Sequence, residues 1–474
     1  MRTDNPSGTP RNAPDSTRRT MLKAAGLTAL LGATGLSTAR AADRRAAAAT
    51  YDVIVIGAGF AGVTAARELF RNGRKPLILE AQNRIGGRTY THDFVGEKVE
   101  LGGAFFDATH PHAWKEIQHY KLQLTSDPGP EVAYFPAEQG FRAYAPVDGF
   151  GHLASLVTPV FDGSRDYLPT PRNPFAREDL LRPVDKLRLI DRINALNYSP
   201  VDRKWVTGNL GGLSGNSTRG SLTQMAQWWA LSDWDFQKFS GGQSSRLVHG
   251  TAAFLKAMLD DSGSQLRLNS PVTAIADDGR SVRVTTKGGT VYQAPEVVIA
   301  VPVNVWNTIT FTPGLPQVYR GLAAATVAVP KAKKLFLHIR SSKGLFYAAG
   351  AEGEPGLSDV APVHKLADGH LAFGFSLDPS LDVNNAAQVQ QSLRRWVPDA
   401  EVLAVKGHDW GSDPYARGGW TYKQPGQLTG PLRTVQNPVG RLAFAGSDIA
   451  TGWSGWVDGA IESGLRAAGQ ILVR

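Results

Sequence analysis

The chain has 474 residues with ordinary apolar (42%) and charged (20%) fractions, so it is long enough for two or three domains with a large core. The absence of cysteine excludes disulfides, thiolate metal sites and a cofactor linked through cysteine. The net charge of +9 comes from scattered Lys and Arg residues, so no nucleic-acid-binding patch is predicted.

The N-terminal segment is predicted to be an export signal. Residues 17–23 read TRRTMLK, a twin-arginine pattern, and a mildly apolar stretch follows at 24–39. That stretch is too short and too weakly apolar to span a membrane, and Ala39-Arg40-Ala41 fits a cleavage site. We therefore expect a signal peptide over 1–41, a linker over 42–50, and a periplasmic or extracellular protein without a membrane anchor. The alternative is a disordered basic arm that contains Arg-Arg by chance.

A dinucleotide-binding unit is predicted between residues 51 and 91. The apolar run Val53–Ile56 is typical of a buried parallel strand, and a helix over about 61–72 and a strand at 76–79 follow. Three glycines at the dinucleotide spacing permit a tight turn, backbone approach to a pyrophosphate and close helix packing: Gly57, Gly59 and Gly62. Glu80 ends the second strand, where a carboxylate can accept hydrogen bonds from an adenosine ribose. The unit by itself does not distinguish NAD from FAD.

Two segments further along suggest walls of a ligand cavity. The apolar stretch Val99–Phe106 is broken by Gly102 and Gly103, which allow either close approach to a flat ligand or a bulge or tight turn. The aromatic segment Gln227–Trp234 is either an apolar cavity wall or ordinary helix core.

The middle of the chain is predicted to be rich in strands. Residues 265–302 form short alternating strands, read as a meander that returns to a parallel strand at 297–301, and a second such region covers 326–375. In residues 334–339, alternation places Leu335, Leu337 and Ile339 on one face and Lys334, Phe336 and His338 on the other. Lys334 would then point into a cavity; the alternative is a solvated edge formed by Lys331, Lys333 and Lys334.

The C-terminus carries a second concentrated signal. A short apolar strand in RLAFAGSD ends in glycine and acid, and a helix is predicted from Val457 onward. Gly459, Ala460, Gly464 and Ala467 give this helix a small-residue face that packs tightly or approaches a cofactor. Its first turn offers free N–H groups to an anionic or polar ligand edge.

Four motifs together resemble the flavin-dependent amine oxidase family over essentially the whole mature chain: GAGFAG, LEAQNRIGGRTYT, ELGGAFF and FAGSDIATGWSGWVDGAIESGLRAA. The last is similar to the C-terminal motif of monoamine oxidases. The segment THPHAWKEIQHYKL, together with the twin-arginine signal, is most similar to exported bacterial amine oxidases of the nicotine oxidoreductase type. The resemblance implies an α/β fold with an FAD-binding Rossmann-like domain (GR2-type) and an α+β substrate domain on a mixed or antiparallel sheet, as in monoamine oxidases.

The implied division of the chain is discontinuous. The FAD-binding domain would comprise residues 51–124, 241–315 and 425–474, and the substrate-binding domain residues 125–240 and 316–424.

Within this family the glycine unit and Glu80 imply FAD rather than NAD. Arg88 is implied near the pyrophosphate, and the backbone of Val272 would face the adenine. Asp448 matches the carboxylate that binds the ribityl chain, where glutamate is more frequent, and Gln82 stands where many members have arginine. The residues expected to contact FAD are Gly57, Gly59, Ala61, Gly62, Glu80, Ala81, Arg88, Gly102, Gly103, Ala104, Phe105, Val272, Gly446, Asp448, Trp456 and Val457.

The resemblance implies three catalytic residues. Trp420 and Trp456 match the two walls of the aromatic cage in front of the flavin, where monoamine oxidases usually place tyrosines. Lys334 matches the lysine that holds a water near flavin N5. The substrate would contact Phe105, Trp420 and Trp456. Gly419 occupies the position of the flavin-linking cysteine of some relatives, so FAD is expected to be non-covalent.

The implied activity is oxidation of a primary or secondary amine at the α-carbon by hydride transfer to flavin N5, giving an imine and then a carbonyl compound. Oxygen, yielding hydrogen peroxide, or a periplasmic electron-transfer protein such as a cytochrome would reoxidise the flavin, and a homodimer is one possible assembly. Two alternatives remain: a non-catalytic flavoprotein, or an L-amino acid oxidase that uses Arg246 or Arg340 for the substrate carboxylate. No metal site is expected, because His110, His112 and His119 read as loop and helix-surface residues.

Overall fold

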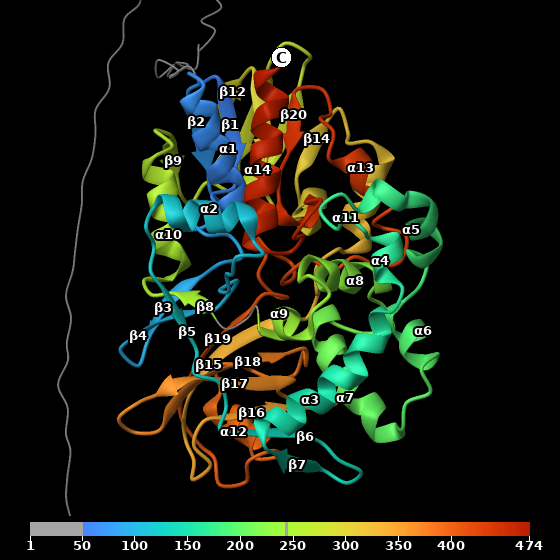
Figure 1. Ribbon diagram of the computed structural model, residues 1–474. Helices are drawn as coiled ribbons and strands as arrows, with labels where there is room; N and C mark the ends of the chain where they lie inside the picture. Colours follow the sequence, from blue (N-terminus) through green and yellow to red (C-terminus); the bar gives the residue numbers. More distant parts are fainter. Residues whose placement is uncertain (1–50, 242–244) are drawn as a thin grey trace, which may run out of the picture. The chain divides into compact units, whose positions relative to one another are not determined.

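A parallel sheet combines strands from distant parts of the chain (Figure 1). The computed structural model describes residues 51–241 and 245–474, so the predicted signal peptide and linker lie outside the described residues. The strand order is β20 (Leu442–Phe444), β13 (Glu296–Ile299), β1 (Val53–Ile56), β2 (Pro76–Leu79) and β9 (Gln265–Arg267). Every residue of β1 and β2 is buried, as expected of parallel strands covered on both faces.

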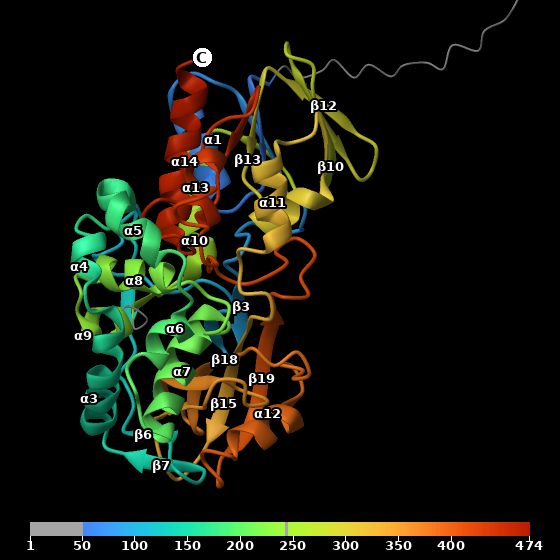
Figure 2. The ribbon, with the colours of Figure 1, turned by 90° about the vertical axis from the view of Figure 1, so that its right-hand side faces the viewer.

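Two helices lie side by side against this sheet in both ribbon views (Figures 1 and 2). They are α1 (Phe60–Arg71), which follows the glycine turn, and α14 (Val457–Leu472), the predicted C-terminal helix. A Cβ atom added to Gly464 would lie 2.5 Å from the carbonyl oxygen of Ala61. The small-residue face of α14 therefore packs directly against α1.

The predicted meander is present, but its first strand is assigned wrongly. β10 (Val272–Asp277), β11 (Val282–Thr286) and β12 (Val291–Ala294) pair in antiparallel fashion, and β14 (Thr310–Thr312) joins β10 in parallel. β9, expected in the meander, instead pairs with β2 at the edge of the parallel sheet. Local alternation is the same in either sheet, so the pattern alone could not separate them.

The second large sheet has seven strands and is mixed, as predicted. Its strands are joined in the order β19-β15-β18-β17-β16-β6-β7, and every pair is antiparallel except β16 with β6. The strands are β6 (Val132–Pro136), β7 (Phe141–Tyr144), β15 (Lys333–Arg340), β16 (Phe346–Ala349), β17 (Asp359–Lys365), β18 (His370–Ser376) and β19 (Glu401–Asp409). All seven come from the ranges predicted for the substrate-binding domain; the division into two domains itself stays a prediction.

The two faces of β15 have the predicted alternation. Leu335, Leu337 and Ile339 pack into a buried core that includes side chains of α12 (Ala386–Leu393). Lys334 lies on the opposite face and is also buried. The alternative of a solvated lysine edge is wrong for this strand, because β15 is hydrogen-bonded on both sides and Lys333 is buried as well.

A helical layer lies beside the seven-stranded sheet in both ribbon views (Figures 1 and 2). Trp205 of this layer stacks on Phe135 of β6 at 4.0 Å between ring centroids and donates a hydrogen bond from Nε1 to the Pro136 carbonyl. Helices α3 (Pro146–Val157) and α7 (Pro200–Ser214) contact β6 of the sheet. The layer continues through α6 (Leu189–Asn194), which packs on α7, and α8 (Leu222–Leu231), which packs on α6. Beyond the sheet, α4 (Ser164–Tyr167), α5 (Glu178–Val184) and α9 (Phe236–Gly241) pack on α8. The remaining strands and α-helices are β3 (Thr91–Phe94), β4 (Glu97–Glu100), α2 (Pro111–His119), β5 (Leu124–Ser126), β8 (Ser245–Leu247), α10 (Gly250–Asp260), α11 (Gln317–Ala325) and α13 (Leu432–Val435).

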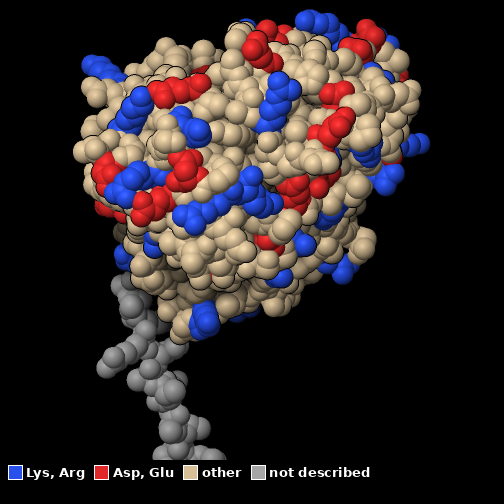
Figure 3. All heavy atoms as spheres, turned by 90° about the horizontal axis from the view of Figure 1, so that it is seen from below, with Lys and Arg blue, Asp and Glu red and all other residues tan. Residues whose placement is uncertain are grey.

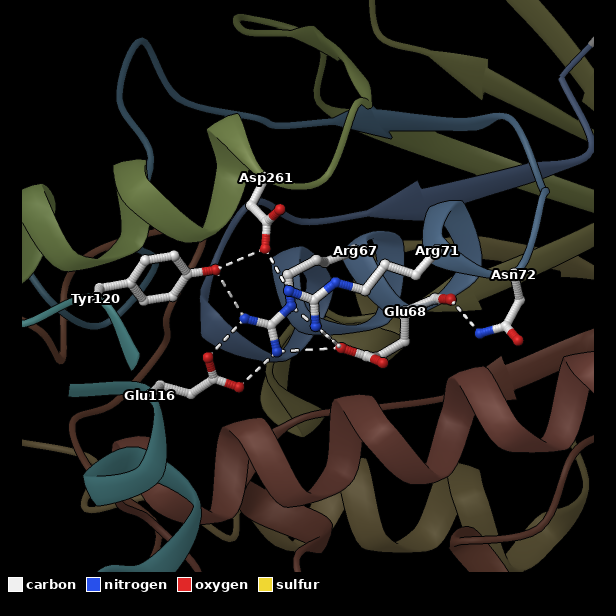
Figure 4. A network of polar contacts seen from close by, with 7 residues as sticks. All are labelled: Arg67, Glu68, Arg71, Asn72, Glu116, Tyr120 and Asp261. Atoms are coloured by element: carbon white, nitrogen blue, oxygen red, sulfur yellow. Dashed lines mark hydrogen bonds and ion pairs between the residues drawn. The ribbon is translucent and has the colours of Figure 1, made fainter. Parts of the chain in front are cut away.

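A buried ion pair ties α1 to its neighbours (Figure 4). The guanidinium of Arg67, only 1% exposed, donates two hydrogen bonds of 2.6 and 2.5 Å to the carboxylate of Glu116 on α2. It also donates to the Tyr120 hydroxyl, which donates in turn to Asp261 beyond the end of α10. Arg71 of α1 pairs with the same Asp261. The network joins α1, α2 and the end of α10.

We expect Glu116→Gln to lower the free energy of unfolding by about 2 kcal/mol, because the buried Arg67 cation keeps its charge but loses its carboxylate partner. Thermal and urea unfolding of the flavin-loaded protein measure the change. The matched control is Glu97→Gln, since Glu97 pairs with His364 at a 42% exposed surface position and its loss should cost little. Equal unfolding midpoints for the two variants would contradict the structural role of the Arg67 network.

The surface seen from below carries both signs of charge interspersed (Figure 3). Exposed ion pairs of the described residues include Arg340 with Asp368 and Glu401, and Lys365 with Glu131. Within the described ranges, no helix combines the length and apolarity needed to cross a bilayer.

Candidate active site

A cavity of about 980 Å³ reaches from the parallel sheet to the seven-stranded sheet. Most of the predicted site residues line it together: Gly57, Gly59, Ala61, Glu80, Ala81, Arg88, Gly102, Gly103, Ala104, Phe105, Val272, Lys334, Trp420, Gly446, Trp456 and Val457. Gly62 and Asp448 do not line it. One end of the cavity is built by the parallel sheet and the glycine turn, and the other by aromatic side chains and Lys334.

The glycine turn at the end of β1 needs its glycines. Gly57 has φ +108, and a Cβ there would lie 2.8 Å from the Ala300 carbonyl oxygen. A Cβ on Gly62 would lie 2.0 Å from the Gly57 carbonyl oxygen, so Gly62 serves the packing of α1 on the turn rather than lining the cavity. Gly59 is the N-cap of α1, and as a glycine it has no side chain that could accept a hydrogen bond from the first turn. The first-turn N–H groups of α1 therefore remain free for an anion.

Glu80 organises this turn as well as lining the cavity. Its carboxylate accepts hydrogen bonds of 2.8 Å from the backbone N–H groups of Ala58 and Gln82. Burial raises the pKa of Glu80, while these N–H groups act to lower it. Its contact with a ribose stays a prediction.

Arg88 and Asp448 form a buried ion pair that shapes the middle of the cavity. Nη1 of Arg88 lies 2.7 Å from Oδ1 of Asp448, whose carboxylate also accepts hydrogen bonds from the Val303 N–H and the Thr421 hydroxyl. Burial alone would raise the pKa of Asp448, but Arg88 and these hydrogen bonds hold it below its ordinary value. Arg88 also donates to Ser447. Asp448 thus positions Arg88, and its predicted contact with the ribityl chain stays a prediction.

The donor set fits a flat dinucleotide cofactor. Besides α1, the N-terminus of α14 opens on the cavity, since Val457 and Ala460 of its first turn line the wall. Gly102 and Gly103 leave another wall without side chains, and a Cβ on Gly102 would lie 2.2 Å from the Arg88 carbonyl oxygen. Two helix N-termini, one guanidinium and glycine walls suit a pyrophosphate and a planar ring system.

Lys334 is buried at the other end of the cavity. Its Nζ donates a hydrogen bond of 2.9 Å to the carbonyl oxygen of Gly102 and lies 4.8 Å from the ring centroid of Phe105. The rings of Phe373 and Phe375 lie at 5.5 Å. Burial lowers the pKa of Lys334 to about 7, although Glu100 opposes the shift. Lys334 is therefore a lysine that can lose its proton near neutral pH.

The two predicted cage residues line the same cavity and are held rigidly. Trp420 donates from Nε1 to the Leu213 carbonyl at 2.7 Å and packs edge-on against Phe375. Trp456 is surrounded by Trp228, Trp453 and His110, with ring centroids 6.0, 5.3 and 5.0 Å away.

The aromatic segment on α8 serves both predicted purposes. Trp228 lines the cavity and donates from Nε1 to the Ser454 carbonyl. Trp229 instead stacks on Phe161 in the core at 5.1 Å. Neighbouring positions on a helix face different directions, so each interpretation holds for one tryptophan.

His110 lies in the loop before α2, as predicted, but it is buried rather than exposed. Its ring is 2% exposed, packed against Trp453 and Trp456, and burial lowers its pKa to about 4. His119 is exposed, as expected. Residues 51–241 and 245–474 hold no group of three His, Asp or Glu side chains arranged to bind a metal ion.

Neither arginine required by the amino acid oxidase alternative is available. Arg246 is paired with Asp127 through hydrogen bonds of 3.0 and 2.5 Å, and Arg340 pairs with Asp368 and Glu401 at half-exposed positions.

The cavity is also lined by residues that were not predicted from the sequence, including Tyr347, Asp359 and Phe375. Strand alternation could have assigned each of them a face, but it carries no signal for the neighbouring strand.

Comparisons with known proteins agree with this site. A family model described as flavin containing amine oxidoreductase matches residues 60–472. Pseudooxynicotine dehydrogenase from Pseudomonas sp. is 34% identical over 434 residues, covering 89% of this chain and 86% of the relative. Nicotine dehydrogenase from Pseudomonas putida is 32% identical, covering 89% and 88%.

Solved structures show the same fold. Wild-type putrescine oxidase bound to putrescine superposes with a TM-score of 0.75 at 21% identity, covering 90% of this chain and 99% of that chain. At this identity the likeness concerns the fold alone. The glycine turn, the Arg88–Asp448 pair, the buried Lys334 and the family match lead to one conclusion: the chain belongs to the flavin-containing amine oxidoreductase family and is an FAD-dependent enzyme acting on amines.

Proposed function

We propose that the protein oxidises a primary or secondary amine at its α-carbon, with non-covalently bound FAD. One observation carries the proposal: Lys334 is buried on the Gly102 carbonyl, beside Phe105, in the cavity that Trp420 and Trp456 line. Gly419 supports non-covalent binding, because a Cβ there would lie 2.5 Å from the Cβ of Ala332.

Bound FAD supplies a hydride acceptor for the α-carbon of the amine. The chain's own residues prepare the substrate. Trp420 and Trp456 exclude water and so favour the neutral amine, whose lone pair assists loss of the hydride. Lys334, with its lowered pKa, holds or moves a proton near the reacting carbon. The imine released from the site takes up water and yields a carbonyl compound and a smaller amine or ammonia.

The pairing of Arg246 favours amines over amino acids as substrates. Arg246 does not line the cavity, and its guanidinium is neutralised by Asp127, so it is not free to bind a substrate carboxylate. Steady-state rates with amino acids and with their decarboxylated amines separate the two classes. Faster turnover of the amino acids would overturn this part of the proposal.

The purified, FAD-loaded protein is expected to lose its oxidised flavin absorbance when mixed anaerobically with at least one member of a panel of primary and secondary amines. The measurement is stopped-flow absorbance without an acceptor. A spectrum that no amine bleaches would count decisively against amine oxidation. Hydrogen peroxide formed per amine consumed in air then shows whether oxygen is the acceptor.

The names of the relatives leave the acceptor open, since both Pseudomonas proteins are called dehydrogenases. We propose that oxygen or a periplasmic electron-transfer protein such as a cytochrome accepts the electrons of the reduced flavin.

We also propose export by the twin-arginine route, which carries folded proteins and so suits an enzyme that takes up FAD first. Fractionation of cells that express the full chain and a variant with Arg18 and Arg19 replaced by Lys tests the route.

A further inference from the structure

Asp359 lies in one row with Lys334 across the seven-stranded sheet. The register pairs Lys334 with Phe375, and Phe375 with Asp359. Directly paired residues share a face, so the three side chains point to the same side of the sheet. Val360, the next residue of β17, packs into the core of the opposite face. Two strand spacings place the Cα atoms of Lys334 and Asp359 about 10 Å apart.

The Asp359 carboxylate differs from the other acids of the cavity wall. Asp127 is held by Arg246, Asp413 by His408 and a backbone N–H, and Glu80 by two backbone N–H groups. Among the described groups none donates a hydrogen bond to the side chain of Asp359, and Lys334 is engaged with Gly102 instead. Asp359 is half-buried in the cavity wall, where a carboxylate without a hydrogen-bond partner is costly.

The surroundings of Asp359 suit an organic cation. Phe375 is its direct cross-strand neighbour, and Tyr347 and Phe150, with ring centroids 5.1 Å apart, line the same cavity. Aromatic faces attract ammonium groups, most strongly where water is excluded. Burial raises the pKa of Asp359 to about 7, against the opposing charge of Lys334, so a bound cation would stabilise the ionised form.

We propose that Asp359 binds a second protonated nitrogen of the substrate, so that the enzyme acts on diamines or on amines with a distant cationic group. This assignment rests on the proposed amine oxidation. The reacting amine lies at the Trp420, Trp456 and Lys334 end, and the second cation lies beyond Phe375, against Asp359 and the ring of Tyr347.

The test compares α,ω-diaminoalkanes with n-alkylamines of equal numbers of non-hydrogen atoms, over chains of four to eight carbons. Anaerobic flavin reduction gives a rate and a substrate Kd for each compound. In the wild type the best diamine should exceed its matched monoamine in rate over Kd by about 30-fold or more. In Asp359→Asn this ratio should fall toward one, because the diamine loses more rate over Kd than its matched monoamine does. Asp162→Asn is the charge-matched control. It removes an exposed carboxylate that does not line the cavity, so this variant should keep the diamine advantage.

A second measurement does not depend on turnover. Bis-trimethylammonium alkanes cannot be oxidised through a neutral amine, and calorimetry should show them binding the wild type more tightly than the singly charged analogues. Reduction by monoamines without a diamine advantage would overturn the Asp359 assignment and leave amine oxidation intact. No reduction by any amine would overturn the proposed function, and equal dication binding by wild type and Asp359→Asn would overturn the cation site. A preference for amines that carry a neutral hydrogen-bond acceptor at the far end would equally overturn it.

Discussion

Replacing Lys334 by Met is expected to lower steady-state turnover about 100-fold while FAD stays bound. Met has a similar length and is apolar, so it can fill the space among Phe105, Phe373 and Phe375 without leaving a buried charge. What it removes is the amine that donates to Gly102 and can exchange a proton near pH 7. Flavin absorbance of the purified variant measures cofactor retention, and stopped-flow reduction and reoxidation show which half-reaction slows.

The sign of the pH dependence follows from the lowered pKa of Lys334. Below about pH 7 the side chain is a cation, and above it a neutral amine that can accept a proton. If the neutral form is the working form, turnover of the wild type should fall as pH drops through about 7. Lys334→Met should lose that limb of the profile.

Lys333→Met is the matched control for Lys334. The Lys333 ammonium lies on the opposite face of β15 and donates to the carbonyls of Pro379 and Leu381. Its loss should reduce stability but leave turnover per bound flavin close to that of the wild type. Unchanged kinetics in Lys334→Met, or equal losses in both variants, would contradict the assigned role of Lys334.

Replacing Asp448 by Asn is expected to weaken FAD binding by about 100-fold or more. Asn cannot neutralise the Arg88 guanidinium, and breaking a buried ion pair by removing one partner costs about 3–5 kcal/mol. The Asn NH2 group would also face a donor, either the Val303 N–H or the Arg88 and Thr421 donors, so Arg88 should leave its place at the cavity wall. Fluorescence titration of the flavin-free protein with FAD measures the change.

Asp458→Asn separates this effect from a general loss of stability. Asp458 is equally buried at the start of α14, but its carboxylate accepts hydrogen bonds from the backbone of His112 and Ala113 and does not line the cavity. The control should lower the unfolding midpoint without a comparable loss of FAD affinity. If Asp448→Asn bound FAD like the wild type, Asp448 would not position Arg88 for the cofactor.

The glycine-turn end of the cavity could be predicted from sequence because its contacts are local. Gly57, Gly62 and Glu80 act within one strand–helix–strand unit, where spacing along the chain nearly equals spacing in the fold. The side of β15 that carries Lys334 could also be predicted, since alternation is a property of a single strand. Asp448 shows the limit of a motif: its position was expected, but its partners Arg88, Thr421 and Val303 come from three separate segments.

By itself, the sequence determined the cofactor class, the family, the strands and helices that carry the motifs, and the face on which Lys334 lies. The tertiary structure decided which residues meet. It moved β9 into the parallel sheet, buried His110 behind Trp456, and neutralised Arg246 with Asp127. It also placed Asp359 on the same face of the sheet as Lys334, two strands away and in line with it. The register between strands depends on how the strands pair and pack, and no pattern within a single strand determines it.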